Sequence, residues 1–452
     1  MLKKVLIANR GEIAVRIIRA CREMGIRCVA VYSTADRHAL HVQLADQAVC
    51  IGKPAARDSY LKANALLTAA RITGCDAVHP GFGFLSEDAD FARQCREAGL
   101  IFVGPSPEAI TLLGDKARAK QTMQAAGVPV IPGSDGIVAD LASAKEIAAR
   151  IGYPLLIKAS AGGGGRGIRP VYREEELESQ MRTASEEAAS CFGCADVYME
   201  RLLLHPRHVE VQILADSQGN VVHLGERDCS MQRRKQKLME ESPCAILSPA
   251  LRQQMGDAAV QAAKQCGFTN AGTVEFLTDG KEFFFMEMNT RIQVEHPVTE
   301  AVTGIDLVQA QLRIAAGEPL GFTQSDVQIR GHAIECRILA ENPAENFRPC
   351  PGVIQGLYMP GGPGVRVDSA IYQGCQIPPF YDSMLAKLIV HAPTRAQAIA
   401  KMNWALAEFL VDGVDTNIDM QLELIRSDAF RSGTYDTGYL AELEKKGGAG
   451  NA

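Results

Sequence analysis

The chain has 452 residues, of which 47% are hydrophobic and 22% charged, and its formal net charge is −6 at pH 7. This composition is that of a globular protein with roughly two to four domains. The acidic balance argues against nucleic acid or an anionic membrane as the main partner. No apolar run is long enough to span a membrane or to act as a signal peptide. With 13 scattered cysteines that indicate reduced thiols, these features predict a cytoplasmic protein.

The first 110 residues or so alternate short apolar stretches with amphipathic ones, which predicts strand–helix units and a parallel sheet. The turn after the first strand, Asn9-Arg10-Gly11, lacks the G-x-G-x-x-G pattern that admits a pyrophosphate. We therefore expect a Rossmann-like sheet that binds no dinucleotide. The expected elements are a strand over Lys3–Ala8, a helix over Glu12–Met24, and strands over Arg27–Tyr32, Ala77–His79 and Leu100–Val103.

A glycine-rich loop, Gly162–Gly167, joins two expected strands, Leu155–Ser160 and Ile168–Tyr172. No Walker sequence is present, so this is not a P-loop. Backbone N–H groups of such a flap can close over phosphates, and Lys158 on the first strand can neutralise them. The alternative is a mobile surface loop without a ligand; we favour phosphate binding, because ordering so many glycines costs considerable chain entropy.

Two apolar segments, Thr273–Leu277 and Phe283–Met288, flank a turn sequence, which predicts a β-hairpin. Glu275 and Glu287 lie among these apolar residues, where carboxylates are normally paired or bound to a metal. A two-residue turn would put the two glutamates on opposite faces. A three-residue loop, Asp279-Gly280-Lys281, makes them diagonal neighbours on one face. We expect the three-residue loop and a Mg²⁺ shared by the two carboxylates.

Polar side chains continue at alternate positions after this hairpin. If the segment stays extended, it directs metal ligands, a cation, an amide and a base toward one site. A half-solvated strand with a polar face is the alternative. The residues concerned are Glu287, Asn289, Arg291, Gln293 and Glu295.

The densest basic cluster, Arg233–Lys237, lies in an acidic chain. We interpret it as a site for a small anionic substrate rather than a solvated face. Arg337 is expected on a strand, where by itself it could equally be half of a structural ion pair.

Assembled, these features resemble the biotin carboxylase family of ATP-grasp enzymes, which includes the biotin carboxylase subunit of acetyl-CoA carboxylase. The resemblance extends from Met1 to about residue 445. The motifs that carry it are His79–Glu87, Lys158 with Gly162–Gly167, Glu226–Ser230 running on to Lys237, Glu287–Pro297 and Gly331–Arg337.

The resemblance implies an ATP-grasp fold of mixed α/β and α+β character. Its expected domains are a Rossmann-like N-terminal domain with a parallel sheet over residues 1–113, an ATP-grasp domain over 114–330 and a β-rich C-terminal domain over 331–446. Residues from about 130 to 203 would form a mobile αβ lid within the second domain.

The resemblance also implies which residues bind the nucleotide and its metal. Mg²⁺, with Mn²⁺ as an alternative, would be held by Glu275, Glu287 and Asn289. Adenine would contact the hinge Glu200–Leu203. The implied ATP-binding residues are Lys116, Lys158, Gly164, Gly165, Glu200, Arg201, Leu202, Leu203, His208, Lys235, Glu275 and Glu287.

The implied reaction carboxylates biotin by way of carboxyphosphate. Bicarbonate, deprotonated by Glu295, attacks the γ-phosphate of ATP, and carboxyphosphate then releases CO₂ beside biotin. Biotin would contact Phe82 and Arg337, and Arg337 would stabilise the enolate-like oxygen that develops on it. The implied catalytic residues are Lys237, Arg291, Glu295 and Arg337, and the implied bicarbonate-binding residues are Lys237, Arg291, Gln293, Val294 and Glu295.

Four positions depart from the family pattern. Phe82 replaces the usual tyrosine near the biotin site, and Lys235 and Arg201 replace a histidine and a frequent lysine near the nucleotide. Pro363 replaces a bulky residue that we associate with the dimer contact. These departures put the strength of the dimer in doubt more than the chemistry.

The implied partners follow from the absence of a biotin-attachment sequence. The segment around Lys401 has a helical pattern and lacks the methionine expected before the lysine. Biotin would therefore arrive on a separate biotin carboxyl carrier protein, and a carboxyltransferase would complete acetyl-CoA carboxylase or a related enzyme. That partner would choose the final acceptor. We also expect a homodimer that pairs through the first helix, where Arg19 and Glu23 share one exposed face.

Two other classes of function compete with this interpretation. An ATP-grasp ligase that passes an acyl phosphate to an amine would not need the anion-binding group of Lys237, Arg291 and Glu295. A catalytically dead regulatory subunit would be expected to lose Lys158, Glu275 or Glu287, and all three are present.

Overall fold

The N-terminal part contains the expected parallel sheet. The computed structural model describes residues 2–159, 168–192 and 195–448. Five parallel strands lie in the order β3-β2-β1-β4-β5. Strand β3 was not expected, because most of its side chains are exposed or half-buried and give no apolar run. The elements are β1 (Lys4–Ile7), α1 (Gly11–Glu23), β2 (Arg27–Ser33), η1 (Thr34–Asp36), α2 (Leu40–Leu44), β3 (Gln47–Gly52), η2 (Ala56–Asp58), α3 (Ala63–Thr73), β4 (Ala77–His79), α4 (Ala89–Glu97), β5 (Ile101–Phe102), α5 (Pro107–Gly114) and α6 (Lys116–Ala125).

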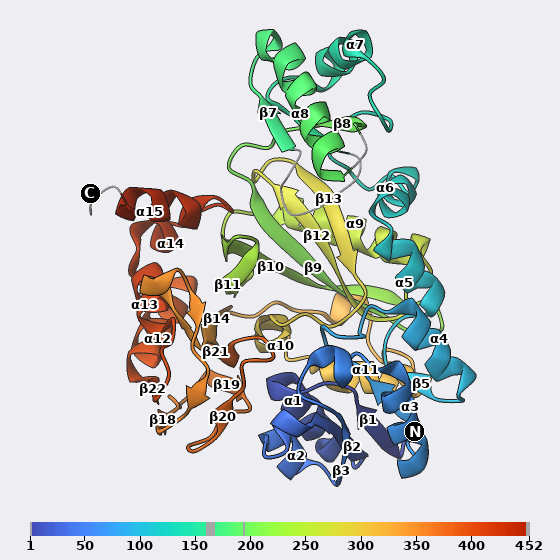
Figure 1. Ribbon diagram of the computed structural model, residues 1–452, viewed down its shortest axis with the longest axis vertical. Helices are drawn as coiled ribbons and strands as arrows, with labels where there is room; N and C mark the ends of the chain where they lie inside the picture. Colours follow the sequence, from blue (N-terminus) through green and yellow to red (C-terminus); the bar gives the residue numbers. More distant parts are fainter. Residues whose placement is uncertain (1, 160–167, 193–194, 449–452) are drawn as a thin grey trace.

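A small αβ unit projects from the rest of the molecule at the top of Figure 1. Its three antiparallel strands lie in the order β7-β6-β8, and α7 and α8 share a separate hydrophobic core with them. The predicted lid corresponds to this unit, and the predicted flap Gly162–Gly167 lies outside the described residues. The elements are α7 (Leu141–Ile151), β6 (Leu155–Ala159), β7 (Ile168–Val171), η3 (Glu174–Glu176), α8 (Leu177–Phe192) and β8 (Val197–Arg201).

An eight-stranded sheet forms the centre of the molecule, in the order β13-β12-β9-β10-β11-β14-β21-β19. The β11–β14 pairing joins strands from either side of the predicted boundary at residue 330, and the domain boundaries remain predictions. The elements are β9 (Arg207–Ala215), β10 (Val221–Arg233), β11 (Gln236–Ser242), α9 (Pro249–Gln265), β12 (Asn270–Thr278), β13 (Phe283–Asn289), α10 (His296–Thr303), α11 (Leu307–Ala315), η4 (Gln324–Asp326), β14 (His332–Leu339), β19 (Val365–Ser369) and β21 (Met384–Ala392).

The C-terminal part adds short strand pairs and helices to one end of this sheet. Apolar residues of β14 and β21 face α12 and α13 and form the largest core of the molecule. The remaining elements are β15 (Glu341–Asn342), η5 (Pro343–Glu345), β16 (Arg348–Pro349), β17 (Gly352–Val353), β18 (Gly356–Tyr358), β20 (Gln376–Ile377), α12 (Arg395–Glu408), β22 (Leu410–Asp412), α13 (Ile418–Arg426), α14 (Asp428–Ser432) and α15 (Tyr439–Gly448).

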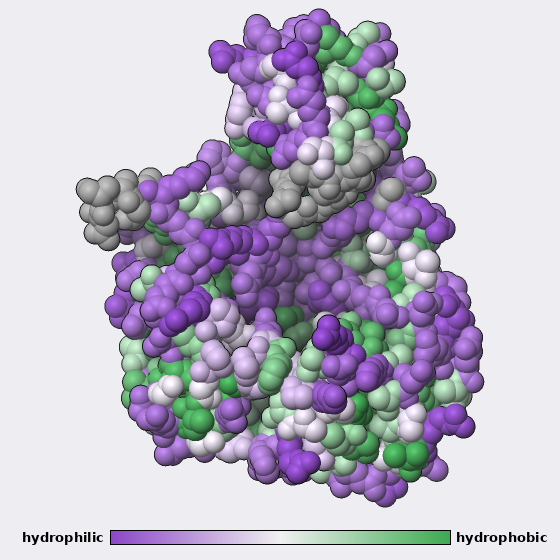
Figure 2. Space-filling model, in the orientation of Figure 1, coloured by the Kyte–Doolittle hydropathy of each residue, from purple (hydrophilic) through white to green (hydrophobic). Residues whose placement is uncertain are grey.

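The arrangement of these parts leaves the central sheet accessible from one side. In Figure 1 the αβ unit lies above the sheet, the N-terminal part lies below it, and the C-terminal helices lie to its left. Figure 2 shows a hollow lined by hydrophilic residues at the centre of this face, between the three parts. In the part of the chain that the structure describes, no helix has the length and apolar character needed to cross a membrane.

Candidate active site

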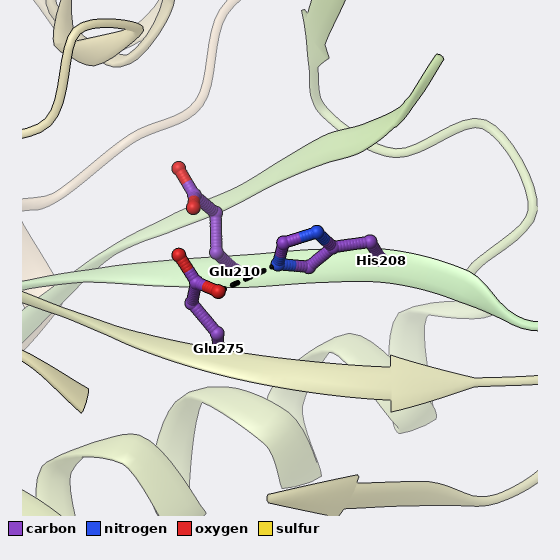
Figure 3. Close-up of side chains that lie close together, drawn as sticks. All are labelled: His208, Glu210 and Glu275. Carbon is purple, nitrogen blue, oxygen red and sulfur yellow. Dashed lines mark hydrogen bonds and ion pairs between the residues drawn. The ribbon is translucent and has the colours of Figure 1, made fainter. Parts of the chain in front are cut away.

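Strand β9 brings a row of polar side chains into the interior. Val209 and Val211 pack into the core beneath α9. Because side chains alternate along a strand, His208, Glu210 and Gln212 project from the opposite face. All three are buried. Glu210 lies directly opposite Glu275 on β12, and His208 Nε2 is 2.9 Å from Glu275 Oε2 (Figure 3).

The hairpin of β12 and β13 places Glu275 and Glu287 on one face, as expected, but the expected register is wrong. The loop has four residues, 279–282, so that Thr278 pairs with Phe283. That register alone would separate the two glutamates. A bulge between Phe285 and Glu287 shifts the pairing by one residue, and Glu275 lies directly opposite Glu287.

The segment after β13 is not the extended strand that the alternation predicted. Strand β13 ends at Asn289, a turn follows, and α10 begins at His296. The expected side chains nevertheless meet. Asn289 Nδ2 donates to Glu275 Oε1 at 2.8 Å, and Gln293 Nε2 approaches the same oxygen at 3.3 Å. Arg291 Nη1 donates to Gln293 Oε1 at 2.8 Å.

Lys237 lies at the centre of these acidic groups. Its Nζ is 2.6 Å from Glu295 Oε1, 2.7 Å from Glu210 Oε2 and 3.3 Å from Glu275 Oε1. Glu210 is also paired with the fully buried Arg227 at 2.5 Å. These charged groups are therefore shielded from water. Each is closely paired with an opposite charge, which buried charges require.

Arg337 holds the other side of Glu295. Its position on β14 confirms the predicted strand, and its Nη2 is 2.9 Å from Glu295 Oε2 and 2.6 Å from Glu240 Oε1. Each oxygen of the Glu295 carboxylate therefore contacts a different cation, Lys237 or Arg337. Since the side chain is fully buried, this pairing fixes both the position and the orientation of the carboxylate.

Burial and ion pairing act in opposite directions on the pKa values of these acids, and the balance differs between Glu295 and Glu240. Burial alone would raise the pKa of Glu295, but Lys237, Arg337 and Arg227 hold it well below its usual value. Burial raises the pKa of Glu240 to about 7 against the effect of Arg337. Glu295 is therefore ionised throughout the physiological range, the form that a general base requires.

A second group of ion pairs lies toward the αβ unit. Lys158 Nζ is 2.5 Å and Lys120 Nζ is 2.8 Å from the carboxylate of Glu200 on β8. Lys116 Nζ is 2.8 Å from Glu287 Oε2. These contacts join the unit and α6 to the site in the central sheet.

The remaining residues of the predicted ATP and biotin sites lie around this centre. Lys235 is exposed in the turn between β10 and β11, and Arg201 pairs with Glu282 at 2.9 Å. Leu202 and Leu203 follow β8, and the carbonyl of Phe82 accepts a hydrogen bond from Asn9 Nδ2. Gly164 and Gly165 lie outside the described residues.

The basic cluster Arg233–Lys237 does not act as a unit. Arg233 contacts Glu444, and Arg234 donates to Asn346, both in the C-terminal part of the chain. Only Lys237 points into the acidic centre. The clustering in sequence reflects the turn between β10 and β11, which carries neighbouring residues to different surroundings.

Sequence reasoning missed several residues of the site. Glu210 was detectable, because polar and apolar residues alternate from His208 to Ile213 along β9. Glu87 accepts a hydrogen bond from Arg291 Nε at 2.9 Å, and its motif was recognised without assigning it a partner. Lys120 and Glu240 had no local signal, since their partners are distant in sequence.

Among the residues that the structure describes, two groups of side chains have ligand atoms close enough to share a metal ion. One consists of His208, Glu210 and Glu275, and the other of Glu210, Cys229 and Glu295. In each group the atoms lie within 4.8 Å of one another. Glu275 belongs to the first group and also faces Glu287 and Asn289, the other predicted metal ligands.

Comparison with known proteins accounts for this arrangement. Models of the biotin carboxylase N-terminal domain, the carbamoyl-phosphate synthase L chain ATP-binding domain and the biotin carboxylase C-terminal domain match residues 1–110, 115–323 and 335–442. Biotin carboxylase 1 of Bacillus subtilis is 56% identical over 449 residues, which cover 99% of this chain and 100% of that protein. The chain belongs to the biotin carboxylase family. It is an ATP-dependent ligase that carboxylates biotin.

Two further relatives are parts of other carboxylases. A pyruvate carboxylase subunit from Methanothermobacter thermautotrophicus is 53% identical, over 98% of this chain and 91% of that protein. The biotin carboxylase domain dimer of Hydrogenobacter thermophilus 2-oxoglutarate carboxylase has a TM-score of 0.87 at 50% identity, with 98% of each chain covered. That structure is a complex with MgADP, ADP and bicarbonate. The family and the ATP-grasp fold predicted from the motifs are confirmed.

Proposed function

We propose that the buried centre around Glu295 activates bicarbonate with ATP and carboxylates biotin that a separate carrier protein presents. The observation that carries this assignment is that Lys237 and Arg337 form ion pairs with the two oxygens of the Glu295 carboxylate. A carboxylate held in this way is ionised, immobile and next to cations that can bind an anion. A bicarbonate-activating base needs these three properties.

Bicarbonate binds, in this proposal, among Lys237, Arg291, Gln293, Val294 and Glu295. Lys237 and Arg291 supply positive charge, and Gln293 supplies an amide that can donate or accept. Glu295 removes the proton, and the bicarbonate oxygen attacks the γ-phosphate of ATP. Glu87, bonded to Arg291, keeps that guanidinium directed toward the loop.

ATP lies between the central sheet and the αβ unit in this proposal. Lys116 and Lys158 neutralise phosphate charge, and His208 fixes the carboxylate of Glu275. Glu275 and Glu287 fit a divalent cation, because they are directly paired in the hairpin and carboxylate oxygens are the ligands that Mg²⁺ prefers. With Asn289 they would hold Mg²⁺, which supplies charge neutralisation on the phosphates. Mn²⁺ has compatible oxygen-ligand preferences.

Biotin binds next to Arg337 and Phe82. The Arg337 guanidinium already spans Glu240 and Glu295, and it stabilises negative charge that develops on the ureido oxygen of biotin. Phe82 offers an apolar surface without a hydroxyl. In the first step ADP leaves and carboxyphosphate forms, which breaks down to CO₂ and phosphate. The phosphate takes the N1′ proton of biotin, and N1′ forms the new bond to CO₂. The two half-reactions therefore share Glu295 and its neighbours but depend differently on Arg337.

The partners are a biotin carboxyl carrier protein and a carboxyltransferase, as in acetyl-CoA carboxylase or a related enzyme, and the compartment is the cytoplasm. The helix α12 around Lys401 supports a separate carrier: Lys401 Nζ donates to the carbonyls of Pro363 and His391 and is not a free attachment site. Because one relative is a subunit of pyruvate carboxylase, the final acceptor of the carboxyl group can be a molecule other than acetyl-CoA.

We also propose a homodimer that includes the exposed face of α1, by analogy with the 2-oxoglutarate carboxylase domain dimer. Arg19 is exposed on this face, and Glu23 accepts a hydrogen bond from Gln309 at 2.7 Å. Sedimentation at micromolar concentration should give a dimer that the Arg19→Glu variant weakens. A monomer under the same conditions would contradict this part of the proposal.

The function is tested by incubating the purified chain with ATP, Mg²⁺, bicarbonate and free biotin. Phosphate release should require bicarbonate and increase with biotin, and carboxybiotin should form. Phosphate release that depends on an added amine instead of bicarbonate would support a different ATP-grasp ligase and contradict the proposal.

A further inference from the structure

A buried lysine on β21, Lys387, contacts the backbone of the loop that carries the proposed bicarbonate ligands. Its Nζ donates to the carbonyl of Val294 at 2.9 Å. The side chain is fully buried. Val294 lies between Gln293 and Glu295, in the turn before α10, so this single bond reaches the main chain next to the proposed base.

The contacts that hold the charged groups of this loop are made through its side chains. Glu87 accepts from Arg291, while Lys237 and Arg337 hold the Glu295 carboxylate. Those three partners face the substrate side, and bicarbonate would compete for the same groups. Lys387 instead contacts the main chain, at the Val294 carbonyl, and can hold the loop whether or not an anion is bound.

The register of the sheet explains why Lys387 is directed at the loop. Lys387 is the direct partner of Arg337 on β14 and of Asp368 on β19. Directly paired residues project from the same face of a sheet. The opposite face carries Cys336 and Leu388, which pack into the C-terminal core. Arg337 and Lys387 therefore extend together toward Glu295 and Val294, from adjacent strands.

Acidic groups make this buried ammonium tolerable. Lys387 Nζ is 3.2 Å from Glu12 Oε2 on α1 and 3.9 Å from Asp368 Oδ2. Asp368 also accepts hydrogen bonds from Nε and Nη2 of Arg366. A buried charge without partners would cost several kcal/mol, and of these two carboxylates Glu12 lies nearer to the Lys387 ammonium. Helix α1, α10, β19 and β21 adjoin in this region (Figure 1).

We propose that Lys387 is a positioning residue for bicarbonate activation, which holds the Val294 carbonyl so that Glu295 stays between Lys237 and Arg337. The inference rests on the proposed bicarbonate site. It assigns a role in the reaction to a residue of the C-terminal part that need not touch the substrate. It also makes Glu12, in the N-terminal helix, an indirect support of the same loop.

The test replaces Lys387 by Met, which keeps length and volume but removes the donor and the charge. The bicarbonate KM should rise about tenfold or more, because a charge-assisted hydrogen bond to the loop is lost. The KM for ATP should stay within about twofold, since the nucleotide residues lie on other strands. Initial rates of phosphate release, measured against each substrate in turn, give both constants.

The matched control is Lys401→Met. Lys401 Nζ also donates to backbone carbonyls, at 2.7 Å and 2.8 Å, and one of them belongs to His391 on β21. Neither carbonyl belongs to the loop, so both KM values should remain near wild type. Equal changes in the two KM values for Lys387→Met, or a bicarbonate KM like that of Lys401→Met, would overturn the proposal.

A second variant covers the case in which Lys387→Met leaves Glu12 unpaired and does not fold. The double variant Glu12→Leu with Lys387→Met removes the buried pair as a whole, a change that proteins often tolerate. It still lacks the donor to Val294, so the selective rise in bicarbonate KM should persist. A folded double variant with a normal bicarbonate KM would contradict the proposal, whereas a wild-type chain without bicarbonate-dependent ATP cleavage would refute the proposed function itself.

Discussion

The two ends of the candidate site differ sharply in burial. At the bicarbonate end, the side chains of Glu295 and Glu210 are 0% exposed, and their ion pairs are surrounded by protein. At the nucleotide end, Lys116 is 81% exposed while it pairs with Glu287. Coulomb interactions are strong in the first environment and screened by water in the second. The bicarbonate end is thus rigid before any substrate binds, and the nucleotide end can exchange partners at little cost.

This contrast suits the two ligands. Bicarbonate is small and offers few contacts, so its site must be arranged in advance. ATP is large, and its many contacts can offset the loss of weak ion pairs such as Lys116–Glu287. Removing a charge should therefore have a large effect at the first end and a modest one at the second.

The largest expected effect is on catalysis at the buried end. Glu295→Ala should reduce bicarbonate-dependent ATP cleavage by about 10²–10⁴, because a general base is removed. Phosphate release at saturating ATP measures it. Glu444→Ala, which removes an acid that pairs with Arg233 far from the site, should stay near wild type. A Glu295→Ala enzyme with more than half the wild-type rate would contradict the assignment of Glu295 as the general base.

The next effect is on stability. Glu210→Leu leaves Arg227 and Lys237 without their shared carboxylate and should lower the free energy of unfolding by about 3–5 kcal/mol. Glu282→Leu removes the exposed pair with Arg201 and should cost less than about 1 kcal/mol. Urea denaturation of both variants gives the comparison. Equal losses in the free energy of unfolding would contradict the expected difference between buried and exposed ion pairs.

A smaller effect is expected at the exposed end. Lys116→Met should raise the KM for ATP by about tenfold, since one phosphate-neutralising charge is lost, with little change in the bicarbonate KM. Its melting temperature should change hardly at all, because exposed pairs contribute little. A substantial loss of stability, or a selective rise in the bicarbonate KM, would mean that Lys116 belongs to the rigid part of the site.

The sequence predicted which residues form the site. It did not predict the strand register and the turn that bring them together. Glu275, Glu287, Asn289, Arg291, Gln293 and Glu295 do converge. The reasons differ, because the hairpin has a longer loop and a bulge, and the segment after Asn289 turns into α10. A bulge depends on how β13 packs against its neighbours, so the alternation of side chains alone could not reveal it.

Partners that come from distant strands were beyond sequence reasoning. Lys387 lies 93 residues from Val294, and its apolar strand context indicates an ordinary core position. Glu240 likewise meets Arg337 only because β11 and β14 are adjacent in the sheet. Motifs identified the residues proposed to meet the substrates, whereas the residues that hold them in place required the strand order.

The division between the two half-reactions is tested most directly with Arg337→Ala. Phosphate release without biotin and formation of carboxybiotin should be measured on the same preparation, with the melting temperature as the control for folding. Because Lys237 still holds the other oxygen of Glu295, slow, biotin-independent ATP cleavage should fall much less than biotin carboxylation, which should fall by about 10²–10³, the usual effect of losing one stabilising donor. Equal loss of both activities at unchanged melting temperature would contradict the assignment of Arg337 to biotin and of Glu295 to bicarbonate.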